Sequence, residues 1–207
     1  MRRWTPTALA LCLVLPAALN AQVRGIPVIN SGFGIGAGVA AEVGFANDAA
    51  GGGTAVAASA STGLGFIGLT GAISRSVVDD NTVWSPGAAV SLRIFGGPLI
   101  PFRVTLLTGA SYWKEGIVEQ LHVPVSLGLA AVIPNPVFAI RPWIAPRIDH
   151  QVTTFENSED SRTELGISGG IELGFLSGMV IRAAYDRLLV DSDPGILSFG
   201  VGFSLGR

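Results

Sequence analysis

The chain of 207 residues has little charge and only one cysteine, Cys12. Asp, Glu, Lys and Arg make up 14% of the sequence, and the formal net charge of −2 gives no reason to expect a nucleic-acid partner. A mean hydropathy of +0.53 would suit a helical membrane protein. After residue 21, however, no run of 18 or more apolar residues occurs, which excludes a membrane-spanning helix there.

Residues 1–21 have the pattern of a secretory signal peptide. Two arginines precede a short apolar run, and Ala21 supplies a small residue before the expected cut at Gln22. The run is too short for a spanning helix, which needs about 20 residues. We therefore expect residues 1–21 to be removed and residues 22–207 to form one exported, cysteine-free domain.

The last segment, residues 196–207, alternates strictly between apolar and small residues. Its apolar residues are Leu197, Phe199, Val201, Phe203 and Leu205, and the small ones between them are Ser198, Gly200, Gly202 and Ser204. A strand with this period of two has one apolar face and one small face. A water-soluble sheet usually carries Lys, Glu, Thr or Gln on its wet face. Gly and Ser instead suit a strand with lipid on one side and a crowded lumen on the other.

This segment resembles the C-terminal assembly signal of bacterial outer-membrane β-barrels, in which a polar residue is followed by x-Gly-x-x-aromatic-x-hydrophobic. The matching residues are Ser198, Gly200, Phe203 and Leu205, and the chain departs from the pattern by continuing for two residues. The resemblance, to the small outer-membrane barrels of the OmpA and OmpX type in general, covers nearly all of residues 32–207. It implies residence in the outer membrane of a Gram-negative bacterium, contact with its lipid, and insertion by the barrel assembly machinery.

Period-two alternation recurs along the chain and predicts ten strands. The expected strands are 32–46, 54–64, 67–76, 86–95, 102–113, 119–132, 137–151, 163–175, 179–190 and 196–207. Connections after odd-numbered strands are longer and more polar, above all 77–85 and 152–162, as in barrels whose loops face outward and whose short turns face the periplasm. An even strand count would also place both ends of the domain in the periplasm. We predict a transmembrane antiparallel up-and-down β-barrel of about ten strands, with eight as the alternative because the 54–76 hairpin has the weakest pattern.

Most charged residues within the predicted strands fall in the inward phase. They are Glu42, Arg93, Arg103, Arg141, Glu172, Arg182 and Asp186. An arginine facing lipid at the midplane would cost about 2–4 kcal/mol, whereas one facing the lumen can pair. We expect mutually neutralised ion pairs that fill a narrow lumen, and the alternative is a water-filled path with a charged constriction. Four charged residues near strand ends are expected at the membrane interface: Arg75, Arg147, Asp149 and Arg187. An interfacial aromatic girdle is expected from Trp84, Trp113, Trp143, Tyr112 and Tyr185.

No catalytic, cofactor or metal site is predicted, because the two histidines, His122 and His150, have no ligand cluster around them in the sequence. Asp149 next to His150 could suggest an acid–base pair, but adjacent residues of a strand point to opposite faces. The favoured interpretation is a non-enzymatic outer-membrane barrel with a structural or surface-interaction role. The alternatives are a narrow pore for small solutes and a lipid- or peptide-modifying enzyme. A soluble lipocalin-like barrel is disfavoured because the strands lack a polar outer face.

Overall fold

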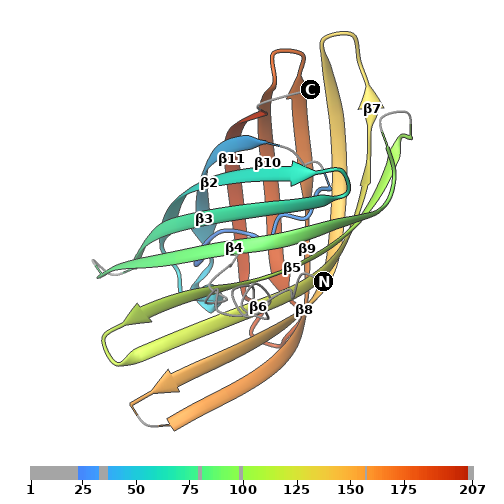
Figure 1. Cartoon of the computed structure of the whole chain (residues 1–207). Helices are drawn as coiled ribbons and strands as arrows, with labels where there is room; N and C mark the ends of the chain where they lie inside the picture. The colour runs from blue at the N-terminus through green and yellow to red at the C-terminus, as the bar shows by residue number, and fades with distance from the viewer. Residues whose placement is uncertain (1–22, 33–36, 79–80, 98–99, 157, 205–207) are drawn as a thin grey trace, which may run out of the picture.

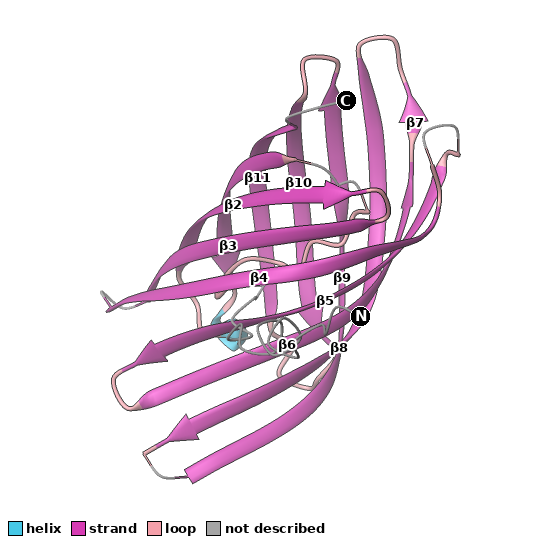
Figure 2. Ribbon diagram, in the orientation of Figure 1, coloured by secondary structure: helices cyan, strands magenta, loops and turns pink. Residues whose placement is uncertain are grey.

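Ten long antiparallel strands form a closed ring (Figures 1 and 2). The structure, a computed structural model, describes residues 23–32, 37–78, 81–97, 100–156 and 158–204. The strands of the ring are β1 (Gly38–Ala46), β2 (Thr54–Leu64), β3 (Ile67–Val78), β4 (Asn81–Phe95), β5 (Phe102–Glu115), β6 (Val118–Ala131), β8 (Phe138–Phe155), β9 (Ser158–Phe175), β10 (Met179–Leu188) and β11 (Gly195–Ser204). The two-residue β7 (Ile133–Pro134) pairs with β8 outside the ring, and a 3-10 turn, Asp48–Ala50, follows β1.

Two pairings close the barrel. Each strand of the ring pairs with its neighbour along the chain, β6 pairs with β8 across the short β7, and β1 pairs with β11 in a register that sets Gly38 opposite Ser204. The predicted fold class and the count of ten strands are therefore confirmed, including the weakly patterned hairpin of β2 and β3.

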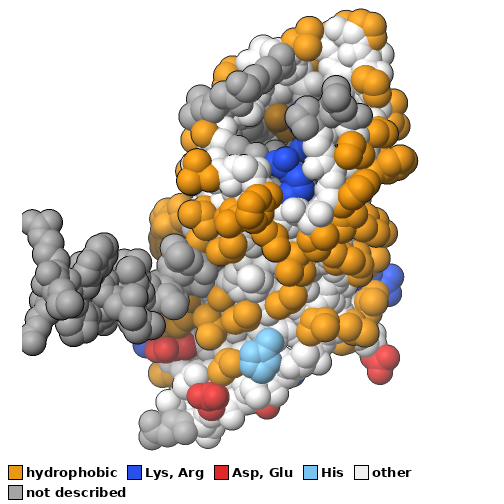
Figure 3. All heavy atoms as spheres, turned by 45° about the vertical axis from the view of Figure 1, so that its right-hand side comes forward, with side chains coloured by type: hydrophobic (Ala, Val, Ile, Leu, Met, Phe, Trp, Pro, Cys, Tyr) orange, Lys and Arg blue, Asp and Glu red, His pale blue; other side chains and the backbone are white. Residues whose placement is uncertain are grey.

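The alternating sequence is apolar on the outside of the ring. Val39, Leu127 and Phe199 are 51%, 39% and 48% exposed, while Ser198, next to Phe199, is fully buried. Apolar side chains cover much of the outer face in Figure 3. Within the described residues, no helix has the length and hydropathy to cross a membrane.

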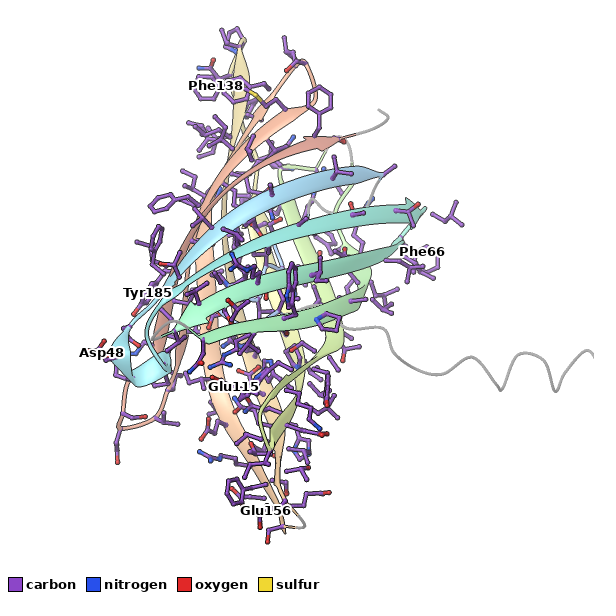
Figure 4. The ribbon with its side chains drawn as sticks, turned by 90° about the vertical axis from the view of Figure 1, so that its left-hand side faces the viewer. Asp48, Phe66, Glu115, Phe138, Glu156 and Tyr185 are labelled. Carbon is purple, nitrogen blue, oxygen red and sulfur yellow. The ribbon has the colours of Figure 1, made fainter. Side chains whose placement is uncertain are left out.

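The two ends of the barrel differ. At one end, the short-turn end, β2, β4, β6, β9 and β11 finish. At the opposite, loop end the hairpins β5–β6 and β8–β9 continue past the ring, and β8 and β9 each have 18 residues. Figure 4 shows Phe138, at the start of β8, far from Glu156, in the turn after it.

Two predicted loops are largely strand. Residues 77–85 were expected to be a loop, but β3 continues to Val78 and β4 starts at Asn81. Likewise β8 reaches Phe155 and β9 starts at Ser158, within the expected loop 152–162. The loop prediction was wrong because it used polarity as the signal. Where a hairpin leaves the membrane, both of its faces meet water, and strand residues there are polar too.

A described segment that precedes β1 lies inside the barrel. Residues 23–32, here called the lumenal segment, include Val28 at 0% and Asn30 at 2% exposed. Arg24 bonds Glu115 near the loop end, and the carbonyl of Gly32 accepts a bond from Arg103 near the short-turn end, so the segment runs the length of the lumen. The start of β1 and the end of β11 lie side by side at the short-turn end, as an even strand count requires, whereas the described part of the chain before β1 begins near the loop end.

The expected first strand, 32–46, is shorter in the structure. It begins at Gly38, Gly32 belongs to the lumenal segment, and residues 33–36 lie outside the described residues. Two barrel glycines make room for the lumenal segment. A Cβ at Gly44 would lie 1.9 Å from the carbonyl oxygen of Gly25, and one at Gly128 would lie 2.2 Å from that of Asn30. Only glycine allows the two backbones to approach so closely.

Candidate functional site: the lumen and the outer extension

A buried ion cluster occupies the loop-side half of the lumen. Arg147 donates from Nε to Asp149 at 2.6 Å and from both terminal nitrogens to Asp186 at 2.7 Å each. His122 Nε2 lies 2.7 Å from the other oxygen of Asp149. Arg147, Asp149 and Asp186 are all less than 5% exposed. Each of the three buried charges therefore has an oppositely charged partner in direct contact, which is the condition for a buried charge to be tolerated.

Arg147 and Asp149 were predicted at the membrane interface, and that prediction was wrong. Both residues do lie where β8 leaves the ring, but their side chains point into the lumen and are buried instead of reaching the interface. A Cβ at Gly166, opposite Arg147 on β9, would lie 2.9 Å from the guanidinium carbon, so this glycine also provides space for the cluster.

The ion cluster and its neighbours hold the middle of the lumenal segment. Val28 donates its N–H to Asp186 at 2.9 Å, and its carbonyl accepts from Ser168 Oγ at 2.7 Å. The side-chain amide of Asn30 donates to the carbonyls of Thr105 and Ser126 and to Ser126 Oγ at 2.9–3.2 Å. Strands β5, β6, β9 and β10 therefore all bond this segment.

The loop end of the lumen is closed around Arg24. Its guanidinium is 2.8 Å from Glu115 and stacks 4.2 Å above the ring centre of Trp113. Its carbonyl accepts a bond from Ser74 at 2.9 Å. Val23 packs nearby in a small apolar cluster with Ile26 and Ala55.

A row of charges crosses the short-turn half of the lumen. Arg182 lies 3.0 Å from Glu42 and 3.1 Å from Glu172. Ser31, in the lumenal segment, donates to Glu172 at 2.9 Å. Arg182 and Glu42 both stand opposite Gly200, where a Cβ would lie 2.7 Å from Glu42 Cγ, so Glu42 reaches Arg182 across that glycine.

The other arginines of this row also lie inside the ring. Arg141 stands opposite Glu172 in the β8–β9 register, and Arg103 donates to the carbonyl of Gly32 at 3.3 Å. Arg93 is half-buried between the exposed Leu92 and Ile94. All seven charged residues predicted in the inward phase thus face the lumen, in two groups that the sequence could not separate.

The aromatic and C-terminal residues are placed as follows. Trp84, Tyr112 and Tyr185 face outward, as a girdle requires, but Trp143 is buried in the lumen and Trp113 lies under Arg24, so the girdle prediction was wrong for these two. Arg75 and Arg187 are exposed, and their interfacial position stays a prediction. Of the proposed assembly signal, Ser198 and Gly200 face inward and Phe203 outward, while Leu205 lies outside the described residues.

The histidines do not form the adjacent pair considered from the sequence. His150 is exposed and contacts Thr163 at 3.0 Å, on the face opposite to the buried Asp149. The histidine that contacts Asp149 is His122, which the pairing of β6 with β8 brings beside it, and this contact can be found only from the strand register. In the part of the chain that the structure describes, no group of three His, Cys, Asp or Glu side chains could hold a metal ion.

Beyond the ring, the ends of β5, β6, β8 and β9 form a four-stranded sheet, here called the outer extension (residues 112–115, 118–123, 150–155 and 158–164). β6 stays paired with β8 up to Val118 and Phe155, but the pairing of β9 with β10 starts only at Gly166. Among the described strands, none pairs with 158–164 on the side away from β8.

The outer extension is acidic. Its side chains include Glu115, Glu119, Glu159, Asp160 and Glu164 against Lys114 and Arg162, with Glu156 in the turn. Lys114 pairs with Glu119, and the hydrogen bonds from Lys114 and Tyr112 hold the pKa of Glu119 below its ordinary value.

The chain was compared with protein families, curated proteins and solved structures. No family model and no curated protein matches it. Among solved structures, the N-terminal β-barrel domain of Pseudomonas aeruginosa OprF is 15% identical with a TM-score of 0.40, over 89% of this chain and 100% of that one. The outer-membrane enzyme PagL is 13% identical with a TM-score of 0.40, over 82% and 99%. Neisserial surface protein A is 13% identical with a TM-score of 0.35, over 82% and 97%.

The geometry identifies the kind of protein. In a bilayer only helices and closed barrels satisfy their backbone hydrogen bonds, and barrels of this kind belong to outer membranes. With ten antiparallel strands closed into a ring, apolar on the outside and polar within, the chain is an outer-membrane β-barrel protein.

Proposed function

We propose that this protein is a non-catalytic surface-interaction barrel, anchored in outer-membrane lipid by its apolar face, that binds basic partners through the outer extension while its lumen stays closed. The observation that carries the proposal is the extension itself. A strand needs about 9–11 residues to cross the membrane, so the 18 residues of β8 and of β9 reach on the order of 20 Å beyond it. Long loops and extensions of such barrels face the outside of the cell.

The chemistry of the extension favours a cationic partner. Glu159, Asp160 and Glu164 lie along the strand that has no neighbour beyond it, and Arg162 is the one basic side chain of this stretch. Charged side chains keep an open edge from self-association, and they also attract and orient an oppositely charged partner.

Binding of a basic probe protein would test this role. The purified barrel in lipid nanodiscs should bind cytochrome c, and the triple variant Glu159→Gln, Asp160→Asn, Glu164→Gln should bind it at least fivefold more weakly, because three surface charges are lost. Binding should also weaken between 50 and 300 mM salt, where screening increases. The matched control, Asp191→Asn with Asp193→Asn, removes acids from the β10–β11 loop and should bind like the wild type. Equal binding by all three proteins would contradict the proposal.

The closed lumen is tested separately in planar bilayers. The wild-type barrel should show no discrete openings, because the lumenal segment and its ion pairs occupy the path. Deletion of residues 23–32 should produce openings. Wild-type openings of the same size as those of the deletion variant would instead favour a channel.

A further inference from the structure

The lumen is not filled along its whole width. A cavity of about 340 Å³ lies between the lumenal segment and the inner faces of β1 to β4, and Gly38, Gly178 and Ser204 line it at the short-turn end. Figure 3 shows a hollow in the upper part of the molecule with basic side chains inside it. At the other end, Val23 and Ile26 close the cavity by packing against Ala55.

The two walls of this cavity have different chemistry. The wall formed by β2, β3 and β4 consists of small residues, and its hydroxyl groups come from Ser59, Ser61, Thr70 and Ser91. The small size of these residues is the reason that the space remains. The opposite wall, from β5, β8 and β10, carries the side chains of Arg103, Arg141 and Arg182.

The charged wall is basic in sum. Arg182 is held between the two carboxylates of the cavity, Glu42 and Glu172. Arg103 and Arg141 bring further positive charge to the same space, and Arg93 lies within electrostatic range of Arg103. Among the side chains that line the cavity, three arginines against two glutamates leave a net charge of about +1, in an interior where charges interact more strongly than in water. An anion in the cavity would offset the repulsion between Arg93, Arg103 and Arg141.

We propose that this cavity binds a small hydroxylated anion of the sugar-phosphate type, which enters from the short-turn end. Guanidinium groups bind phosphate oxygens through paired, charge-assisted hydrogen bonds. The Ser and Thr hydroxyls of the facing wall both donate and accept, so they suit the hydroxyl groups of a sugar. The cavity volume is within the range of small-molecule sites, about 300–1,000 Å³. Because the site opens away from the outer extension, it does not rest on the surface role proposed above.

Calorimetric titration of the full barrel in nanodiscs tests the site, with glucose 6-phosphate, inorganic phosphate and glucose as the probes. Glucose 6-phosphate should bind, phosphate should bind at least fivefold more weakly, and glucose should give no heat. Arg103→Gln and Arg141→Gln should each weaken the binding of glucose 6-phosphate at least tenfold. Arg162→Gln, which removes the same charge from the outer extension, should leave it unchanged.

A second variant keeps the test decisive if the arginine variants fold poorly. Ser59→Leu adds bulk to the uncharged wall, leaves the three arginines of the cavity in place, and should abolish binding by occupying the cavity. Absence of glucose 6-phosphate binding to the wild type, or binding that survives both Ser59→Leu and the arginine substitutions, would overturn the proposal. Equal affinity for phosphate and for glucose 6-phosphate would overturn the role of the hydroxyl wall.

Discussion

The fit between Gly128 and the lumenal segment allows a sharp test of the plugged lumen. In Gly128→Ala, the new Cβ would lie 2.2 Å from the carbonyl oxygen of Asn30 and 2.7 Å from its side-chain carbon. Ordinary contact starts near 3.4 Å, so the segment must move by more than 1 Å. Such a shift breaks the three bonds from the amide of Asn30. At about 0.5–1.5 kcal/mol each, their loss lowers the free energy of unfolding by about 1.5–4.5 kcal/mol.

Two measurements check this expectation. Urea unfolding in lipid vesicles gives the free energy of unfolding. Thiol labelling of Val28→Cys reports the position of the segment, because Val28 is fully buried and the one native cysteine lies at position 12. The labelling rate should rise at least tenfold when Gly128→Ala is added. The control is Gly71→Ala on β3, where a Cβ meets nothing within 4 Å. If Gly128→Ala matched Gly71→Ala in both stability and labelling, the reasoning about the close approach would be refuted.

Two further predictions concern charge. Asp186→Ala leaves Arg147 without two of its three bonds and Val28 without an acceptor, and should cost about 3–5 kcal/mol by urea unfolding. Asp193→Ala removes an exposed partner of Arg187 and should lower the free energy of unfolding by less than about 1 kcal/mol. Equal losses for Asp186→Ala and Asp193→Ala would contradict the distinction between buried and exposed ion pairs. Leu127→Arg places a charge on the lipid face and should cost about 2–4 kcal/mol, seen as a smaller folded fraction on a detergent gel without heating. Thr153→Arg in the outer extension is the control and should fold like the wild type. If Leu127→Arg also had the folded fraction of the wild type, the outer face of the barrel around Leu127 would lie in water.

Alternation predicted the ring well because lipid on one side and a lumen on the other impose a strict period of two. The bounds of β2 were predicted to the residue, and the outward phase of Leu121, Val125 and Phe199 follows the same rule. The rule fails where the chain leaves the bilayer. There the physical contrast between the two faces disappears, and the strands of the outer extension therefore have the composition of loops.

The contents of the lumen depend on contacts between distant parts of the chain. That Glu42 meets Arg182 across Gly200, or that His122 meets Asp149, follows from strand register, which no local pattern specifies. The lumenal segment was missed for a related reason. Its apolar residues, Val23, Ile26 and Val28, have no period of two. Their place in the lumen depends on the close approach of the segment to Gly44 and Gly128, which the sequence does not reveal.

The position of the lumenal segment also constrains the order of assembly. The segment precedes β1 by only a few residues, and β1 forms with β11 the seam that makes the strands into a ring. After β1 and β11 have paired, the lumenal segment, which is attached at the short-turn end, would have to thread through a narrow lumen lined with side chains to reach Glu115. The lumenal segment must therefore bind the inner face of the open sheet first. The pairing of β1 with β11 then closes the barrel around it.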